Sequence, residues 1–207
     1  TGRDTGRDTG RDTGRDTGRD TGSTLAPAVD TIQDVQNGAI SEFSEVDLEG
    51  VVTAVTDEAM YLQDPLGGPY SAVRVYLGIG FSGTWGTIAE GDYLSVHGQV
   101  VEYSSMTEIN LLTSLTPDLR VTGTEPLPAA QTLTTTELDS AVAEPWEAVL
   151  VEIHNATVST ADFGFGEWGI TDGTTELRVD DELWDYSAHA SGSLQVGDGF
   201  AAITGLV

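Results

Sequence analysis

The feature of this sequence that most restricts its fold is a correspondence between its two halves. Four segments of the first half recur in the same order about 103 to 108 residues further along the chain. The pairs are VDLEGVVTAV with VLVEIHNATV, MYLQDP with WGITDG, AVRVYL with ELRVDD, and EGDYLSVHGQV with VGDGFAAITGLV. A repeated order of segments indicates two copies of one structural unit. We therefore expect two similar small domains, residues 28–128 and 129–207.

Each copy has the pattern of an all-β unit. Its short runs of Val, Ile, Leu, Thr and Tyr are separated by Gly, Asp and Pro, which is typical of strands joined by turns. We expect a long first strand, a hairpin of two shorter strands, an irregular connector and one or two closing strands. Gly50 lies inside the first long strand, where a missing side chain lets a strand bend enough to serve both sides of a small barrel.

Five strands in this order form an OB-type barrel, which is the predicted fold of each copy. The second copy stops at Val207 after its fourth strand, so we expect its barrel to be truncated. A short helix is expected ahead of each copy, in residues 31–40 (TIQDVQNGAI) and in residues 134–143 (TTTELDSAVA). Thr before Glu and Leu in the second segment is a helix-capping pattern.

The chain begins with five copies of the tetrapeptide TGRD. No side chain in it is apolar, so ordering the repeat would cost backbone entropy without burying surface. Residues 1–27 are therefore predicted to be a disordered tether. The triplet DTG also occurs in aspartic proteases, but here no hydrophobic strand precedes it. One Asp in every four residues cannot supply the roughly six to eight oxygens of a calcium site.

The remainder of the chain is strongly acidic. The net charge is -26, and the Arg and Asp residues of the repeats cancel, so the excess lies in residues 23–207. That part contains three arginines, Arg74, Arg120 and Arg178, and the chain has no lysine. Such a surface repels duplex nucleic acid, and no duplex partner is expected. Salt adaptation or secretion would explain this acidic composition, and a GC-rich coding bias would explain it equally well.

Several kinds of site are not expected. The chain has no cysteine, which excludes disulfides and thiolate chemistry, and it has no apolar run of about 18 residues that could span a membrane. His97, His154 and His189 lack the spacing of metal ligands, so neither a metal nor a cofactor is expected. GIGFSG (residues 78–83) resembles a dinucleotide fingerprint, but the glycine-broken segment after it cannot form the required helix. The acidic run VDDEL (residues 179–183) fits a solvated loop better than a calcium site.

Strand alternation in the first copy predicts a candidate binding surface. Alternate residues of the hairpin are apolar and should face the core, namely Met60, Leu62, Val73, Val75 and Leu77. The residues between them should face outward and form an aromatic platform with one cation: Tyr61, Gln63, Tyr70, Arg74 and Tyr76. OB barrels commonly bind oligonucleotides or sugars on this face. The alternative is that these tyrosines cover the barrel or pack against the second copy. The outward set of that copy, namely Glu167, Thr171, Glu176, Arg178 and Asp180, contains no ring.

The segments VDLEGVVTAV, YLQDP and EGDYLSVHGQVVEYSSMTEINL, with EPWEAVLVEIHNATV and WGITDGTTELRVDD, resemble the tandem OB-type domains of secreted bacterial proteins. These domains often lie beside extracellular nuclease or phosphoesterase domains. The resemblance covers roughly residues 28–207. It implies an accessory module, located outside the cell or on its surface, with a tether like the stalks of bacterial surface lipoproteins. The resemblance assigns no catalytic residue to this chain.

We therefore expect a non-catalytic accessory module that positions neighbouring domains of a longer chain and binds a ligand weakly through its first barrel. One alternative is capture of single-stranded nucleic acid for an adjoining nuclease, in which Tyr61 and Tyr76 stack on bases. Another is a carbohydrate-binding or purely structural surface protein. An enzyme is not expected, because no nucleophile, base and oxyanion donor converge in the sequence pattern.

Overall fold

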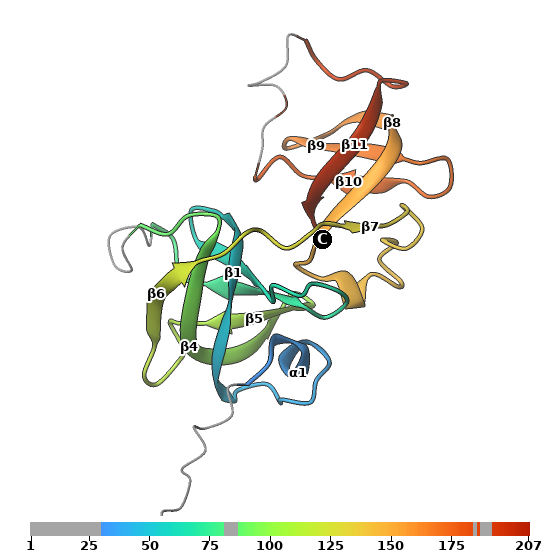
Figure 1. Ribbon diagram of the computed structural model, residues 1–207. Helices are drawn as coiled ribbons and strands as arrows, with labels where there is room; N and C mark the ends of the chain where they lie inside the picture. The colour runs from blue at the N-terminus through green and yellow to red at the C-terminus, as the bar shows by residue number, and fades with distance from the viewer. Residues whose placement is uncertain (1–29, 81–86, 184–185, 187–191) are drawn as a thin grey trace, which may run out of the picture.

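The computed structural model describes residues 30–80, 87–183, 186 and 192–207. The expectations for the repeat tether and for His189 lie outside the described residues. Figure 1 shows two lobes, one built from β1 to β6 and the other from β7 to β11, with the C-terminal end at the junction beside β7. The described part is nearly all β, with one short α-helix. No helix within it combines the length and the apolar character needed to cross a membrane.

The first lobe contains a closed barrel. Its elements are α1 (Ile32–Gln36), β1 (Glu45–Val55), β2 (Ala59–Gln63), β3 (Ala72–Tyr76), β4 (Asp92–Tyr103), β5 (Met106–Asn110) and β6 (Asp118–Thr124). The strands pair in the order β1-β2-β3-β5-β4, and β1 also pairs with β4, which closes the barrel. β3 and β5 run parallel, while the other barrel pairs are antiparallel. This is the OB-type arrangement that the sequence predicted; β6 extends the sheet by pairing with β4.

The barrel closes at Gly50 and Val51 of β1. Val51 pairs both with Tyr93 of β4 and with Gln63 of β2, so β1 passes from one partner to the other at this point. A Cβ atom on Gly50 would lie 2.8 Å from Leu62 Cγ and 2.9 Å from the Gln63 carbonyl oxygen, closer than real Cβ atoms approach. A strand can bend through such a crowded place only with glycine, which confirms the role expected of Gly50.

The barrel core contains the residues that strand alternation predicted. The side chains of Met60, Leu62, Val73, Val75 and Leu77 are at most 3% exposed and belong to one apolar cluster. Helix α1 packs against the barrel and contributes Ile32 and Val35 to the same cluster. Because Thr31 Oγ1 accepts a hydrogen bond from the Asp34 N–H at 3.0 Å, the helix begins where the sequence predicted.

The second lobe contains an open sheet. Its elements are β7 (Gln131–Thr132), a 3₁₀ turn (Glu144–Trp146), β8 (Leu150–Gly164), β9 (Glu167–Thr171), β10 (Leu177–Val179) and β11 (Gly199–Leu206). The strands pair in the order β10-β9-β8-β11, and β7 runs parallel to β8. This order matches β3-β2-β1-β4 of the barrel. Among the described residues no strand joins β10 to β11, in the place that β5 occupies in the first lobe.

The turn before the fourth strand has the same hydrogen bonds in both lobes. In the first lobe the Gly91 N–H donates to the Val52 carbonyl, and in the second the Gly197 N–H donates to the Val158 carbonyl, both at 2.9 Å. An aspartate then caps each turn: Asp92 accepts from the Ala89 N–H, and Asp198 accepts from the Gln195 N–H, again both at 2.9 Å. The sequence correspondence is therefore matched by local geometry.

The expectation of a second lead-in helix is wrong, because residues 134–143 form turns. The cap does form, since the Glu137 carboxylate accepts from the Thr134 N–H at 2.9 Å. The next residues are held elsewhere: Thr135 Oγ1 donates to Asp172 Oδ1 at 2.7 Å, and Thr136 Oγ1 donates to Thr174 Oγ1 at 2.8 Å. Side chains of Thr that find partners outside the segment compete with a helix.

Candidate functional site

The surface predicted to bind a ligand is the outer face of β2 and β3. The two strands pair with Tyr61 opposite Arg74 and Gln63 opposite Ala72. Because Met60, Leu62, Val73 and Val75 fill the barrel, the residues between them face away from it, as the alternation predicted. The directions of the side chains on this face are therefore confirmed.

This face is covered and is not an open platform. Tyr61 is 8% exposed, Gln63 0% and Arg74 9%. Tyr61 and Ala72 belong to an apolar cluster that is otherwise formed almost entirely by the second lobe. The expectation of an exposed aromatic surface is wrong for these residues, and the alternative of packing against the second copy is confirmed for Tyr61. Alternation gives the direction of a side chain and not what covers it. Tyr76 and Tyr70 are both half-buried, and Tyr70 lies in the segment between β2 and β3.

Gln63 connects the two lobes through its amide. Its Nε2 donates to Ser71 Oγ at 3.1 Å, and its Oε1 accepts from the Leu150 N–H at the start of β8 at 3.2 Å. Both the nitrogen and the oxygen of this fully buried amide thus have a hydrogen-bond partner. Gln63 therefore links the first lobe to the start of β8 in the second lobe.

Arg74 is held by two carboxylates of its own barrel. Nη1 lies 2.6 Å from Glu108 Oε2, Nη2 lies 2.7 Å from Glu58 Oε1, and Cζ lies 5.2 Å from the centre of the Tyr76 ring. Burial by itself would lower the pKa of Arg74, but attraction from Glu108 and further neighbours outweighs it and the pKa is raised. The guanidinium stays charged, yet its charge is balanced within the barrel.

Glu147 lies between the lobes and bonds to the barrel. Its Oε1 accepts from the Thr107 N–H at 2.9 Å and from Gln36 Nε2 at 3.2 Å, both in the first lobe. A backbone bond also crosses the junction, since the Tyr70 N–H donates to the Pro145 carbonyl at 2.6 Å. Burial is the main cause that raises the pKa of Glu147, outweighing the hydrogen bond from Gln36. The junction thus combines an apolar cluster with hydrogen bonds between the lobes.

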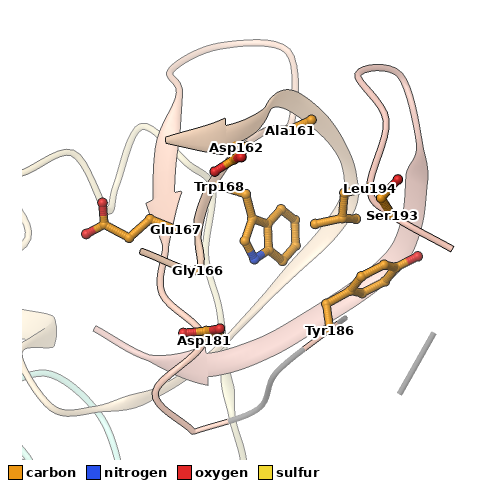
Figure 2. A pocket seen from close by; sticks show the side chains of 9 residues that line it. All are labelled: Ala161, Asp162, Gly166, Glu167, Trp168, Asp181, Tyr186, Ser193 and Leu194. Atoms are coloured by element: carbon orange, nitrogen blue, oxygen red, sulfur yellow. The ribbon is translucent and has the colours of Figure 1, made fainter. Parts of the chain in front are cut away.

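The second lobe has a cleft of about 470 Å³, shown in Figure 2. The rings of Trp168 and Tyr186 line it together with the carboxylates of Asp162, Glu167 and Asp181. Trp168 is 7% exposed, and its ring centre lies 5.7 Å from that of Phe200 on β11. The indole is therefore mainly part of the core, with one edge at the cleft.

Sequence reasoning missed this cleft because it considered only outward residues of the second copy. Trp168 alternates with Glu167 and packs into the apolar cluster of this lobe, as does Phe200 from another strand. A ring also lies on the outer side: Arg178 Cζ is 4.6 Å from the centre of the Phe163 ring, and Nη1 is 2.9 Å from Glu167 Oε2. The five outward residues named from the sequence contain no ring, but Phe163 of β8 lies beside one of them, Arg178. Trp168 in WGITDG was the available signal.

The described histidines pair with acids on their own or neighbouring strands. His97 lies in β4, with Nδ1 2.8 Å from Asp47 Oδ1 and Nε2 3.3 Å from Glu45 Oε2. His154 lies in β8, with Nε2 2.6 Å from Glu152 Oε1. Within the ranges that the structure describes, no three His, Asp or Glu side chains are grouped so as to hold a metal ion.

Comparisons with known proteins assign this chain to no family. No protein-family model matches the chain, and no curated protein matches it. Among solved structures, the hypothetical protein ygiW from E. coli is similar, with a TM-score of 0.33 and 16% sequence identity. The similarity covers 45% of this chain and 90% of that chain. The OB-type assignment of the first lobe rests on its own strand order.

Proposed function

We propose that this chain is a non-catalytic accessory module of a secreted or surface-attached bacterial protein, in which two β domains, residues 28–128 and 129–207, form one rigid body. Its role is to hold neighbouring domains at a fixed spacing. One observation carries the proposal: the face of the first barrel that OB barrels commonly use for ligands is occupied by the second lobe. The lysine-free acidic composition and the resemblance to domains of secreted proteins support the location.

Contacts between the lobes favour rigidity. Tyr61 and Ala72 pack into the apolar cluster of the second lobe, which removes apolar surface from water. Gln63, Tyr70 and Thr107 each take part in a hydrogen bond to the second lobe. Each such bond contributes about 0.5–1.5 kcal/mol net. Domains joined by a polar surface alone would be expected to move, whereas an apolar junction with matched polar groups resists motion.

Backbone ¹⁵N relaxation tests this proposal. We expect the amides of both lobes to report one rotational correlation time. The double change Tyr61→Ala with Gln63→Ala should give two shorter, different times, because it removes a ring and an amide from the junction. The control is Tyr103→Ala, which changes a side chain that is 65% exposed. Lobes that tumble independently in the unaltered protein would contradict the proposal.

Nucleic-acid capture is tested on the same protein. Because Arg74 is paired and Tyr61 is buried, we expect no saturable binding of a fluorescent single-stranded oligonucleotide at low salt. Binding that weakens both with added salt and in Tyr76→Ala would instead support the alternative of nucleic-acid capture. Tyr76 is suited to this test because it is half-buried on the same face.

Carbohydrate binding is a second candidate function, favoured by the cleft of Figure 2. Aromatic edges beside carboxylates are the groups that contact the faces and hydroxyls of a sugar, and the cleft has both. An NMR titration with a panel of oligosaccharides should shift the amides of Gly166 and Ser193 if this candidate is correct. Asp162→Asn should then weaken binding, whereas Asp118→Asn on β6 should not. Titration without shifts at the cleft would exclude it.

A further inference from the structure

A second cleft, of about 520 Å³, lies at the junction of the two lobes beside α1. Its walls come from the end of α1 and the segment after it, from β4 and β5, from Tyr70, and from Glu144 in the 3₁₀ turn of the second lobe. The volume lies within the range of small-molecule sites, about 300–1,000 Å³. Both lobes therefore contribute to one cavity.

The cleft is strongly negative. Glu42, Glu102 and Glu144 line it, and the half-buried Glu147 is close enough that repulsion from Glu144 and Glu102 adds to the effect of burial on its pKa. The salt bridges of the described residues leave these four glutamates without a cationic partner. The three arginines of the described part are paired elsewhere, Arg74 with Glu58 and Glu108, Arg120 with Asp118, and Arg178 with Glu167.

A buried acceptor without a partner belongs to a residue in the wall of this cleft. Gln36 is 6% exposed, and its Nε2 donates to the Ala72 carbonyl at 2.7 Å and to Glu147 Oε1 at 3.2 Å. Its Oε1 is buried and accepts no hydrogen bond from any described residue. Leaving a buried acceptor unpaired is destabilising, so a native structure needs a reason for it. Because Gln36 lines the cleft, we infer that a donor bound there is the missing partner of this oxygen.

We propose that this cleft binds an alkylammonium or guanidinium group, carried by a polyamine or by a lysine or arginine side chain. Such a group donates several hydrogen bonds and accepts none, which matches carboxylates and an amide oxygen. Val35, Ile40 and Val100 also line the cleft and suit the methylene chain behind the charge. A bare metal ion fits less well, because no three of the described acids are grouped as metal ligands.

This site goes beyond the proposed spacer role, since a cation held by Glu102 of one lobe and Glu144 of the other would add a link across the junction. The test uses the whole chain and isothermal titration calorimetry with spermidine and with N-acetyl-lysine amide. We expect saturable binding of at least one of the two, and the tighter ligand identifies the source of the cation. In NMR titrations the shifts should concentrate on the amides of Gly38, Tyr70 and Thr107. Binding of neither ligand would overturn the proposal.

Paired charge variants separate this site from general attraction to an acidic surface. Glu102→Gln with Glu144→Gln should weaken binding of the tighter ligand about tenfold, which corresponds to about 1.4 kcal/mol. Glu90→Gln with Glu125→Gln removes the same charge from exposed positions outside the cleft and should leave the affinity nearly unchanged. Equal weakening in both pairs, shifts spread over the whole surface, or stronger binding of Ca²⁺ than of either ligand at the same amides would also overturn the proposal. The relaxation test of rigidity is unaffected by any of these outcomes.

Discussion

Replacing Gly50 by alanine tests whether β1 closes the barrel in the way described. The added Cβ would lie 2.8 Å from Leu62 Cγ and 2.9 Å from the Gln63 carbonyl oxygen. Leu62 is fully buried and has little room to move, and the Gln63 carbonyl belongs to the backbone of β2. Overpacking of this kind costs about 1–3 kcal/mol. We therefore expect the free energy of unfolding to fall by that amount.

Gly123 in β6 supplies the matched control. It too lies in a strand without a positive φ, and a Cβ atom there would meet nothing within 4 Å. Because alanine costs less backbone entropy than glycine in a strand, Gly123→Ala should leave the stability unchanged or raise it by up to about 1 kcal/mol. The two variants carry the same chemical change, so their difference reports the crowding at β1.

Urea unfolding followed by fluorescence measures both variants. The change should appear in the denaturation midpoint with an unaltered slope, since the native surface is the same. In a thermal melt, each kcal/mol corresponds to about 2–4 °C for a cooperative unit of roughly 150–250 residues. Equal stabilities of Gly50→Ala and Gly123→Ala would refute the closure of the barrel at this residue.

Two further predictions concern carboxylates with shifted pKa values. Glu147→Gln keeps Oε1 as the acceptor for Thr107 and Gln36 while it removes a half-buried charge; it should raise stability at pH 7. A carboxyl whose pKa is raised in the folded state makes the protein less stable as the pH rises above 4.5, the usual pKa of Glu. The free energy of unfolding of Glu147→Gln, measured from unfolding curves at a series of pH values, should therefore lack that decline. Asp172 behaves oppositely: hydrogen bonds from Thr174 and then from Thr135 lower its pKa below 3.8, so it stabilises the fold above that pH and loses this effect as the pH falls. Asp172→Asn should cost about 1–3 kcal/mol at pH 7 by leaving a donor of Thr135 unpaired, with a smaller cost under acidic conditions. Each prediction would be contradicted if the free energy of unfolding of the variant and that of the unaltered protein changed with pH in parallel.

The fold of the first lobe could be predicted because its residues follow simple rules. Val73, Val75 and Leu77 alternate with other residues, and Gly50 marks the bend of β1, so the sequence contains the strand directions and the point of closure. The turn at Gly91 and Asp92 recurs at Gly197 and Asp198, which is why the two halves can be aligned from their residues alone.

Tertiary contacts account for what could not be predicted. The helix expected at residues 134–143 is absent because Thr135 and Thr136 bond to the loop after β9, a partner that is distant in sequence. Strand alternation left two environments open for Tyr61, an open surface and packing against the second copy, and the structure shows the second. The cleft at Trp168 is lined by rings from two separate segments, Trp168 and Tyr186, and Phe200 from a third segment packs against both; period-two patterns do not bring these segments together. Ligand binding by the outer residues of β2 and β3 stays a prediction.

The most direct test of the account is the distance between the two lobes in solution. Because the chain has no cysteine, spin labels can be placed uniquely at Leu115→Cys and Val196→Cys, whose side chains are 84% and 68% exposed. Pulsed electron–electron double resonance should give one narrow distance distribution, which broadens when Tyr61→Ala and Gln63→Ala are added. A broad distribution in the otherwise unaltered chain, insensitive to those changes, would contradict a rigid junction.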